Sequence, residues 1–183
     1  MENSSRSLIP PLSPVSFSVE GRAFLITGGT QGLGLAVARL LKEAGAKALV
    51  LVSRSMEKGK EAAAELCSEK CSTYHIQADL SNSAEVEAIF PKAEKLLGGT
   101  VVEGVVNAAA TTARGNLFTT TADDFDFQMA LNVRAPFLIT QAAAKHITKH
   151  SKGGSIVNIC SVAAHGGAPF IMAYSCSKLR WLR

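Results

Sequence analysis

The sequence has no apolar run of the about 18 residues that a membrane-spanning helix needs. It also has no run of consecutive Lys and Arg: the net charge is +4, and the one local concentration of basic residues, from Lys145 to Lys152, falls near the end of a predicted helix, where cations complement the helix dipole. Aromatic residues make up only 6% of the chain, so a basic surface interleaved with aromatic rings is not expected. These absences predict a soluble, cytoplasmic protein with no membrane or nucleic-acid partner.

Cysteine is also scarce, and its spacing excludes two classes of site. No CxxC pair of the kind found in zinc sites occurs, and the chain is longer than the small secreted domains that depend on disulfides. His146 and His150 are spaced by one helical turn, but the sequence places no third ligand beside them. We therefore predict no metal site and a reducing compartment for the four cysteines, Cys67, Cys71, Cys160 and Cys176.

The first 20 residues are rich in Ser and Pro, and Pro10 and Pro11 directly follow the apolar pair Leu8-Ile9. No signal-peptide hydrophobic region forms there, so residues 1–20 are predicted to be a flexible arm. Import into an organelle stays open, because the arm is Ser-rich and poor in acids. Residues 21–183 are long enough for one domain with an ordinary core.

Within that domain, short apolar strands alternate with helical segments. Parallel strands covered by helices on both faces give such a pattern, so the fold class predicted is α/β, a doubly wound Rossmann-type sheet. The helix over 121–149 is expected to bend around Pro136, and Ser81 or Ser83 is expected to cap the helix before it. The predicted strands are 22–27, 48–52, 73–78, 101–107 and 155–160, and the helices are 35–44, 56–70, 81–97, 121–149 and one from Tyr174.

A glycine-rich turn connects the first strand to the first helix. Such a turn presents backbone N–H groups to a phosphate at the helix N-terminus. Gly28 suits a tight turn, Gly32 the close approach of a pyrophosphate, and Gly34 the packing of helix on strand. The cofactor-binding residues predicted here are Thr27, Gly28, Thr30, Gln31, Gly32, Leu33 and Gly34.

Ser53 and Arg54 follow the second strand. At this point of a dinucleotide-binding unit, a carboxylate holds the ribose 2'-hydroxyl, whereas an Arg accommodates a 2'-phosphate. Ser53 brings no negative charge, and Arg54 offers a cationic fork. The pair predicts NADP(H) in preference to NAD(H), with an ordinary surface arginine as the alternative.

The ends of later strands add further candidates. Asp79 and Leu80 follow the third strand, where the adenine end of a cofactor is expected. Small residues after the fourth strand leave room for a flat ring or a sugar, so Asn107, Ala108 and Ala109 join the predicted cofactor site.

Tyr174 and Lys178 lie four residues apart, which places them on one face of a helix. A fixed ammonium favours the phenolate form of a nearby tyrosine. The pair could therefore donate a proton to a carbonyl or accept one from an alcohol. The alternative is a packed ring beside a solvated charge.

Several motifs occur along the chain in the same order as in classical short-chain dehydrogenases/reductases, and the chain resembles this family. The motifs are Thr27-Gly-x3-Gly32-x-Gly34, Asp79, Asn107-Ala-Ala-Ala110, Asn132, Gly154-Ser-Ile-Val-Asn-Ile-Cys-Ser161 and Tyr174-x3-Lys178.

The resemblance implies a hydride transfer between a nicotinamide cofactor and a carbonyl or secondary alcohol. It implies that Tyr174 is the general acid or base, and that Lys178 assists it and holds the nicotinamide ribose. Ser161 is implied to bind the substrate oxygen, and Asn132 to hold the helix bend and a water that links Lys178 to solvent. A full-length member is expected to be a homo-oligomer acting on a small molecule.

Members of this family usually continue well beyond the Tyr-Lys pair, adding strands and a substrate loop, whereas this chain ends at Arg183. The sequence after Lys178 also departs from the small, apolar continuation typical of the family. The resemblance therefore leaves a second reading open: a truncated dinucleotide-binding fragment without turnover, acting as an interaction partner or without stable function.

Overall fold

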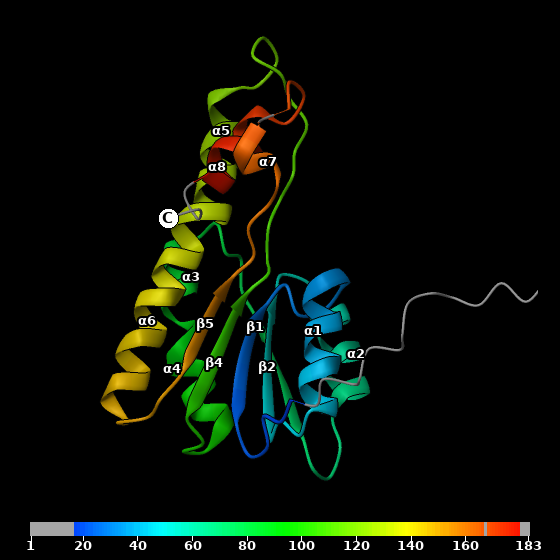
Figure 1. Cartoon of the computed structure of the whole chain (residues 1–183), viewed down its shortest axis with the longest axis vertical. Coiled ribbons are helices and arrows are strands. Elements are labelled where there is room, and N and C mark those ends of the chain that lie inside the picture. Colours follow the sequence, from blue (N-terminus) through cyan, green and yellow to red (C-terminus); the bar gives the residue numbers. More distant parts are fainter. Residues whose placement is uncertain (1–16, 167, 180–183) are drawn as a thin grey trace, which may run out of the picture.

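The computed structural model describes residues 17–166 and 168–179. Most of the predicted arm over 1–20, and the last four residues of the predicted domain, lie outside this range. The described part is a layered α/β structure with a single sheet at its centre (Figure 1).

The sheet has five strands, all parallel, in the order β3-β2-β1-β4-β5. This order places the first strand in the middle, so the chain builds the sheet outward on one side and then on the other. The strands are β1 (Ala23–Thr27), β2 (Ala48–Ser53), β3 (Ser72–Gln77), β4 (Val102–Asn107) and β5 (Ser155–Asn158).

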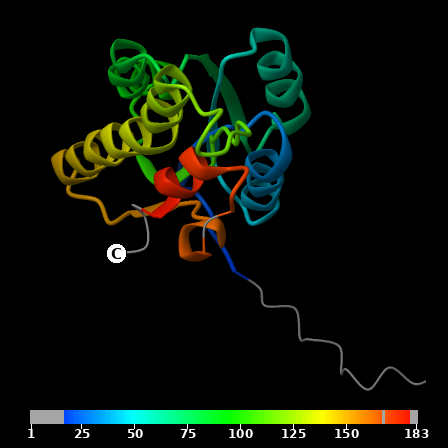
Figure 2. The same ribbon diagram turned by 90° about the horizontal axis from the view of Figure 1, so that it is seen from above.

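Helices cover both faces of the sheet, which confirms the doubly wound α/β class (Figure 2). One face is covered by α1 (Gly32–Glu43) and α2 (Met56–Leu66). The other face is covered by α3 (Ser83–Glu87), α4 (Ile89–Leu97) and α6 (Ala135–Lys149). Beyond the carboxyl ends of the strands lie α5 (Ala122–Met129), α7 (Ala163–Gly166) and α8 (Met172–Leu179).

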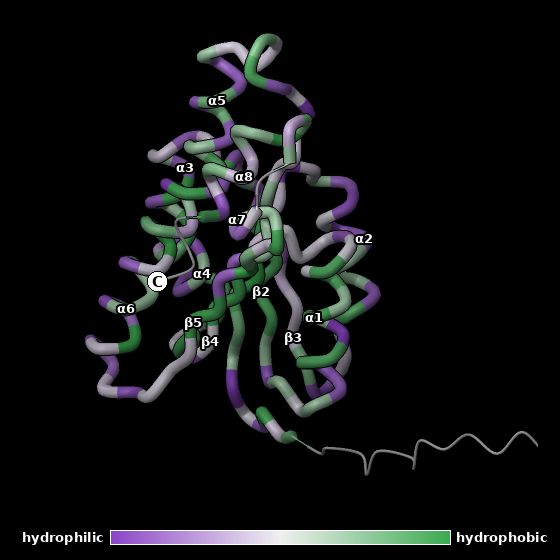
Figure 3. Tube along the Cα trace, turned by 45° about the horizontal axis from the view of Figure 1, so that its top comes forward, coloured by the Kyte–Doolittle hydropathy of each residue, from purple (hydrophilic) through white to green (hydrophobic). Residues whose placement is uncertain are grey.

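Alternating residues of the central strands supply both halves of the core. In β1, Leu25 packs toward α4 and α6, whereas Phe24 and Ile26 pack toward α1 and α2. This explains why the strand is a continuous apolar run: both faces are buried. Figure 3 shows the hydrophobic residues concentrated in the middle of the sheet, with mixed helices around it.

Some predicted boundaries differ from the structure. The helix predicted over 56–70 ends at Leu66, because Cys67 is extended and Ser68 and Cys71 bond each other's backbone in a turn that buries the Cys71 side chain. The cap before α3 is Asn82, not Ser81 or Ser83: its Oδ1 accepts a hydrogen bond from Ala84 N at 3.0 Å.

The segment predicted as one helix over 81–97 is divided into α3 and α4, which meet at Ala88. The strand predicted over 155–160 ends at Asn158, and α8 begins at Met172, two residues before Tyr174. The shifts of β5 and α8 lie at element ends, where local sequence signals are weakest, whereas the break at Ala88 lies inside a predicted helix.

The long helical segment is interrupted just before Pro136 and not at it. A π-helical turn, Ala130–Arg134, separates α5 from α6. Pro136 then lies in the first turn of α6, where its missing N–H costs little. Asn132 lies in this π-turn and is buried. Among the described helices, none is long and apolar enough to cross a membrane.

Candidate active site

The glycine turn between β1 and α1 has the backbone that its sequence predicts. Gly28 and Gly32 have φ angles of 66° and 53°, in the left-handed region that favours glycine. A side chain at Gly34 would collide with the carbonyl oxygen of Gly28, so this residue must be glycine for α1 to start so close to the strand. A Cβ on Gly28 would lie 3.0 Å from the backbone of Ala109, which brings the end of β4 directly against the turn.

A pocket of about 680 Å³ opens beside this turn. Its wall continues over the end of β2, the first turn of α2, the end of β3 and the residues after β4. A pocket of this size suits a cofactor or other small ligand. The predicted cofactor residues that line it are Gly28, Thr30, Gln31, Gly32, Leu33, Gly34, Ser53, Arg54, Leu80, Ala108 and Ala109.

Other predicted cofactor residues support the pocket without lining it. Thr27 Oγ1 accepts a hydrogen bond from Ala109 N at 3.2 Å, and Asn107 Nδ2 donates to Asn158 Oδ1 at 2.8 Å. Asp79 accepts hydrogen bonds from the backbone N–H of Ser81 at 2.9 Å and from its hydroxyl at 2.8 Å. These bonds hold the pKa of Asp79 below its usual value.

Sequence reasoning missed several residues of the wall, of which Lys58 matters most. Its Nζ donates to Gln31 Oε1 at 3.0 Å, so the first turn of α2 is tied to the glycine turn. Ser55 caps α2 by accepting from Lys58 N at 3.3 Å. The sequence signal for it was a second cation four residues after Arg54, in the first turn of the predicted helix over 56–70. The other missed residues are Val52, Ser55, Ala78, Ala110 and Leu131.

The charge of the wall has one sign. Arg54 and Lys58 both line the pocket, and no Asp or Glu is among the described residues that line it. An anionic group entering beside Arg54 would therefore meet two cations on the wall, with the nearby Asp79 carboxylate, whose pKa Arg54 helps to lower, set behind it. This part of the pocket is suited to a phosphate.

Asn132 connects the loop after β4 to α8. Its Oδ1 accepts from Thr111 N at 2.9 Å, and its Nδ2 donates to Thr111 O at 2.9 Å and to Ser177 Oγ at 3.0 Å. Ser177 in turn donates to the carbonyl of Tyr174 at 2.7 Å. Asn132 therefore ties the loop after β4 to α8 at Ser177, three residues after the tyrosine.

Lys178 and Tyr174 share one face of α8, as their spacing predicts. The Lys178 ammonium lies 5.7 Å from the centre of the Tyr174 ring and donates to the carbonyl of Ile159 at 2.8 Å. Only 4% of Lys178 is exposed, and this burial lowers the pKa of its ammonium. The alternative of a solvated lysine is wrong for this structure.

Ser161 lies beyond β5, half-buried, and its Oγ accepts from Ala163 N at 3.2 Å. The backbone just before it reaches α8, because Ile159 O accepts from Lys178 and Cys160 Sγ donates to Lys178 O at 3.5 Å. Ser161, Tyr174 and Lys178 thus come from two neighbouring segments, although none of them lines the pocket beside the glycine turn.

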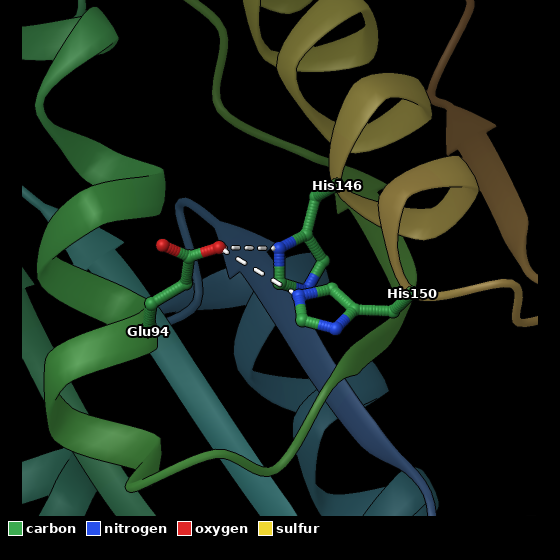
Figure 4. A group of neighbouring side chains, drawn as sticks. All are labelled: Glu94, His146 and His150. Carbon is green, nitrogen blue, oxygen red and sulfur yellow. Dashed lines mark hydrogen bonds and ion pairs between the residues drawn. The ribbon is translucent and has the colours of Figure 1, made fainter.

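A second cluster lies away from this site, between α4 and α6. Glu94 joins His146 and His150 there, so the structure supplies the third candidate metal ligand that the sequence did not place (Figure 4). However, Nε2 of His146 accepts from Val102 N–H at 3.1 Å, so the proton sits on Nδ1 and is donated to Glu94 Oε1 at 2.9 Å. A metal on Nδ1 would have to displace that proton. The cluster therefore suits a hydrogen-bonded link between helices better than a metal site.

Comparisons with known proteins agree with the geometry. The family model for short chain dehydrogenases matches residues 22–180. A short-chain dehydrogenase/reductase of Armillaria gallica is 35% identical over 160 residues, covering 87% of this chain and 60% of the relative. An uncharacterized oxidoreductase of Thermotoga maritima is 36% identical, with 87% and 61% covered. The chain thus spans about 60% of the length of these curated relatives.

Solved structures show the same similarity. A short-chain dehydrogenase from Burkholderia cenocepacia in complex with NADP is 30% identical, with a TM-score of 0.78 and coverage of 87% of this chain and 64% of the other. An NAD+-bound xylitol dehydrogenase is 26% identical, with a TM-score of 0.79 and coverage of 87% and 60%. The family model, the similar sequences and the similar structures therefore all indicate the same family. The chain belongs to the short-chain dehydrogenase family of oxidoreductases.

Proposed function

We propose that the protein is an NADP(H)-dependent oxidoreductase that interconverts a carbonyl compound and a secondary alcohol. The observation that carries the cofactor choice is the wall beside Ser53, where Arg54 and Lys58 line the pocket and no Asp or Glu is among the described lining residues. Both NADP-bound and NAD+-bound relatives are known, so the family alone does not decide between the cofactors. The residues of this chain favour the 2'-phosphate.

The glycine turn would hold the pyrophosphate, because its backbone approaches the pocket closely and α1 begins there. Ala108 and Ala109 would leave space for the nicotinamide side of the cofactor. A bound nicotinamide would supply or accept the hydride. The protein would supply the binding, the orientation and the proton.

Tyr174 is the proposed proton donor to the carbonyl oxygen in reduction, and the acceptor of the alcohol proton in oxidation. Lys178 is held with its ammonium beside the ring, where positive charge favours proton release from the phenol. Ser161 is proposed to donate a hydrogen bond to the substrate oxygen and stabilise its developing negative charge. Asn132 would keep α8 in place through Thr111 and Ser177.

The test is a pair of measurements with NADPH and NADH. Binding is measured first by titration, and reduction of a panel of diketones is then measured with each cofactor. We expect NADPH to bind at least about tenfold more tightly, since a hydrogen bond to a charged group contributes roughly 1.5–3 kcal/mol. A clear preference for NADH would overturn the cofactor assignment. Binding without turnover would instead support a dinucleotide-binding module.

We also propose that the full-length protein is cytoplasmic and forms a homo-oligomer, as is typical of its family. Fractionation of cells and light scattering of the purified protein test these two expectations. A membrane-bound or organellar location, or a monomer at micromolar concentration, would contradict them.

A further inference from the structure

His75 lies beneath the pocket wall and faces Ser53. It belongs to β3, which pairs with β2 so that His75 is beside Leu51 and Gln77 is beside Ser53. The imidazole Nε2 lies 3.0 Å from Ser53 Oγ, a hydrogen-bond distance. A half-buried histidine therefore contacts the residue that the proposed function places next to the 2'-phosphate.

The space for this ring is created by Gly59 in α2. A side chain at Gly59 would overlap the imidazole of His75. Glycine inside a helix costs about 1 kcal/mol relative to alanine, so the sequence accepts a less stable α2 at this position. The ring is consequently enclosed between α2 and the sheet, with its orientation fixed by packing.

The surroundings also decide which nitrogen carries the proton. Nδ1 of His75 is buried and has no hydrogen-bond partner among the described residues. A buried N–H donor without an acceptor is costly, so the proton belongs on Nε2. Burial lowers the pKa of His75, which keeps the ring neutral near neutral pH. His75 Nε2–H then donates to Ser53 Oγ.

Donation from His75 occupies a lone pair of Ser53 and leaves its hydroxyl hydrogen free to donate. The acceptor available in the protein is Ser55 O at 3.4 Å, which makes a long and weak bond. Ser53 lines the pocket next to Arg54, where a phosphate oxygen would be a stronger acceptor.

We propose that His75 is a positioning residue for recognition of the adenosine 2'-phosphate, acting by turning the Ser53 hydroxyl into a donor toward the pocket. This rests on the proposed preference for NADP(H). A purely structural role would affect both cofactors equally, because NADH and NADPH share every group except that phosphate. The difference between the two dissociation constants separates the roles.

The experiment uses two substitutions of His75 in the whole chain. His75→Leu removes the donor and stays apolar, whereas His75→Gln keeps an N–H at a similar distance from the backbone. For His75→Leu we expect the Kd for NADPH to rise about fivefold while that for NADH changes less than about twofold, the effect of one hydrogen bond. His75→Gln is expected to recover most of the NADPH affinity. Thermal unfolding of each variant checks that it is folded.

A double-mutant cycle with Ser53→Ala completes the test. If His75 acts through Ser53, His75→Leu changes the NADPH to NADH ratio no further in the Ser53→Ala background. Equal weakening of both cofactors, or an unchanged ratio in the folded variants, would overturn the inference. A wild-type protein that does not distinguish the two cofactors would instead overturn the proposed function, and this inference with it.

Discussion

The central strands of the sheet and its β5 edge differ in how well they are covered. In β1 every residue is buried, and in β2 only the last residue is partly exposed. In β5, Ile156 packs against the core shared with α6, but Val157 on the opposite face is 48% exposed. A parallel strand is normally buried on both faces, so β5 is incompletely covered in this chain.

The two parts of the proposed site lie on these two differently covered regions of the sheet. The proposed cofactor pocket rests mainly on β1, β2 and the helices packed against them. The candidate proton-transfer residues Ser161, Tyr174 and Lys178 lie beyond β5 and on α8. Cofactor binding should therefore depend on the well-packed central strands, and turnover on the less covered β5 edge.

The largest expected effect comes from Tyr174→Phe. Removing the proposed general acid should lower turnover by about 10²- to 10⁴-fold, while the Kd for NADPH changes by less than about twofold. The steady-state rate of reduction and the Kd for NADPH are measured for the wild type and the variant, both as full-length protein with catalytic activity. Tyr74→Phe, on β3, is the matched control and should keep its activity. Near-normal turnover of the Tyr174 variant would refute the role.

The next effect tests the packing itself. Leu25 is fully buried, so Leu25→Ala should lower the free energy of unfolding by about 2–5 kcal/mol. Val157→Ala should cost less than about 1 kcal/mol, because that side chain is half exposed. Urea unfolding of both variants gives the comparison. A similar loss for both would mean that Val157 is covered in solution.

Arg54→Ala tests the cofactor side with a smaller effect. Loss of a charge-assisted contact should raise the Kd for NADPH about 10- to 100-fold and leave that for NADH nearly unchanged. Arg39→Ala is the control, since Arg39 pairs with Glu65 at 2.7 Å and does not line the pocket. Equal weakening of both nucleotides by Arg54→Ala would show that Arg54 does not read the phosphate.

Asp79→Asn should have the smallest effect, and one that depends on pH. The bonds from Ser81 lower the pKa of Asp79 in the folded chain, so its contribution is present above the unfolded pKa of about 3.9. It is lost as pH falls through the lower, folded pKa. Urea unfolding should show less than about 1 kcal/mol of difference from wild type at pH 7 and less still at pH 3. A difference that grows at low pH would contradict this sign.

Local patterns in the sequence predicted the fold class and the glycine turn. Both depend on neighbours along the chain: apolar runs of strand length, and glycines at fixed steps before a helix. Element ends were predicted less well. α2 stops at Leu66 because Cys71 is drawn into the core, and this contact is not visible in helical periodicity.

The sequence alone was enough to predict the doubly wound sheet, the family and the pairing of Tyr174 with Lys178. The sheet follows from the alternation of strands and helices, the family from the order of motifs along the chain, and the pair from spacing within one helix. Only the tertiary structure brought Lys58 to Gln31, Glu94 to His146, and His75 to Ser53. Those contacts join residues on different elements, and their geometry depends on how helices and strands pack. Arg54 alone indicated from the sequence that the pocket is positively charged. The positions of Lys58 on the pocket wall and of His75 next to Ser53 became known only from the fold.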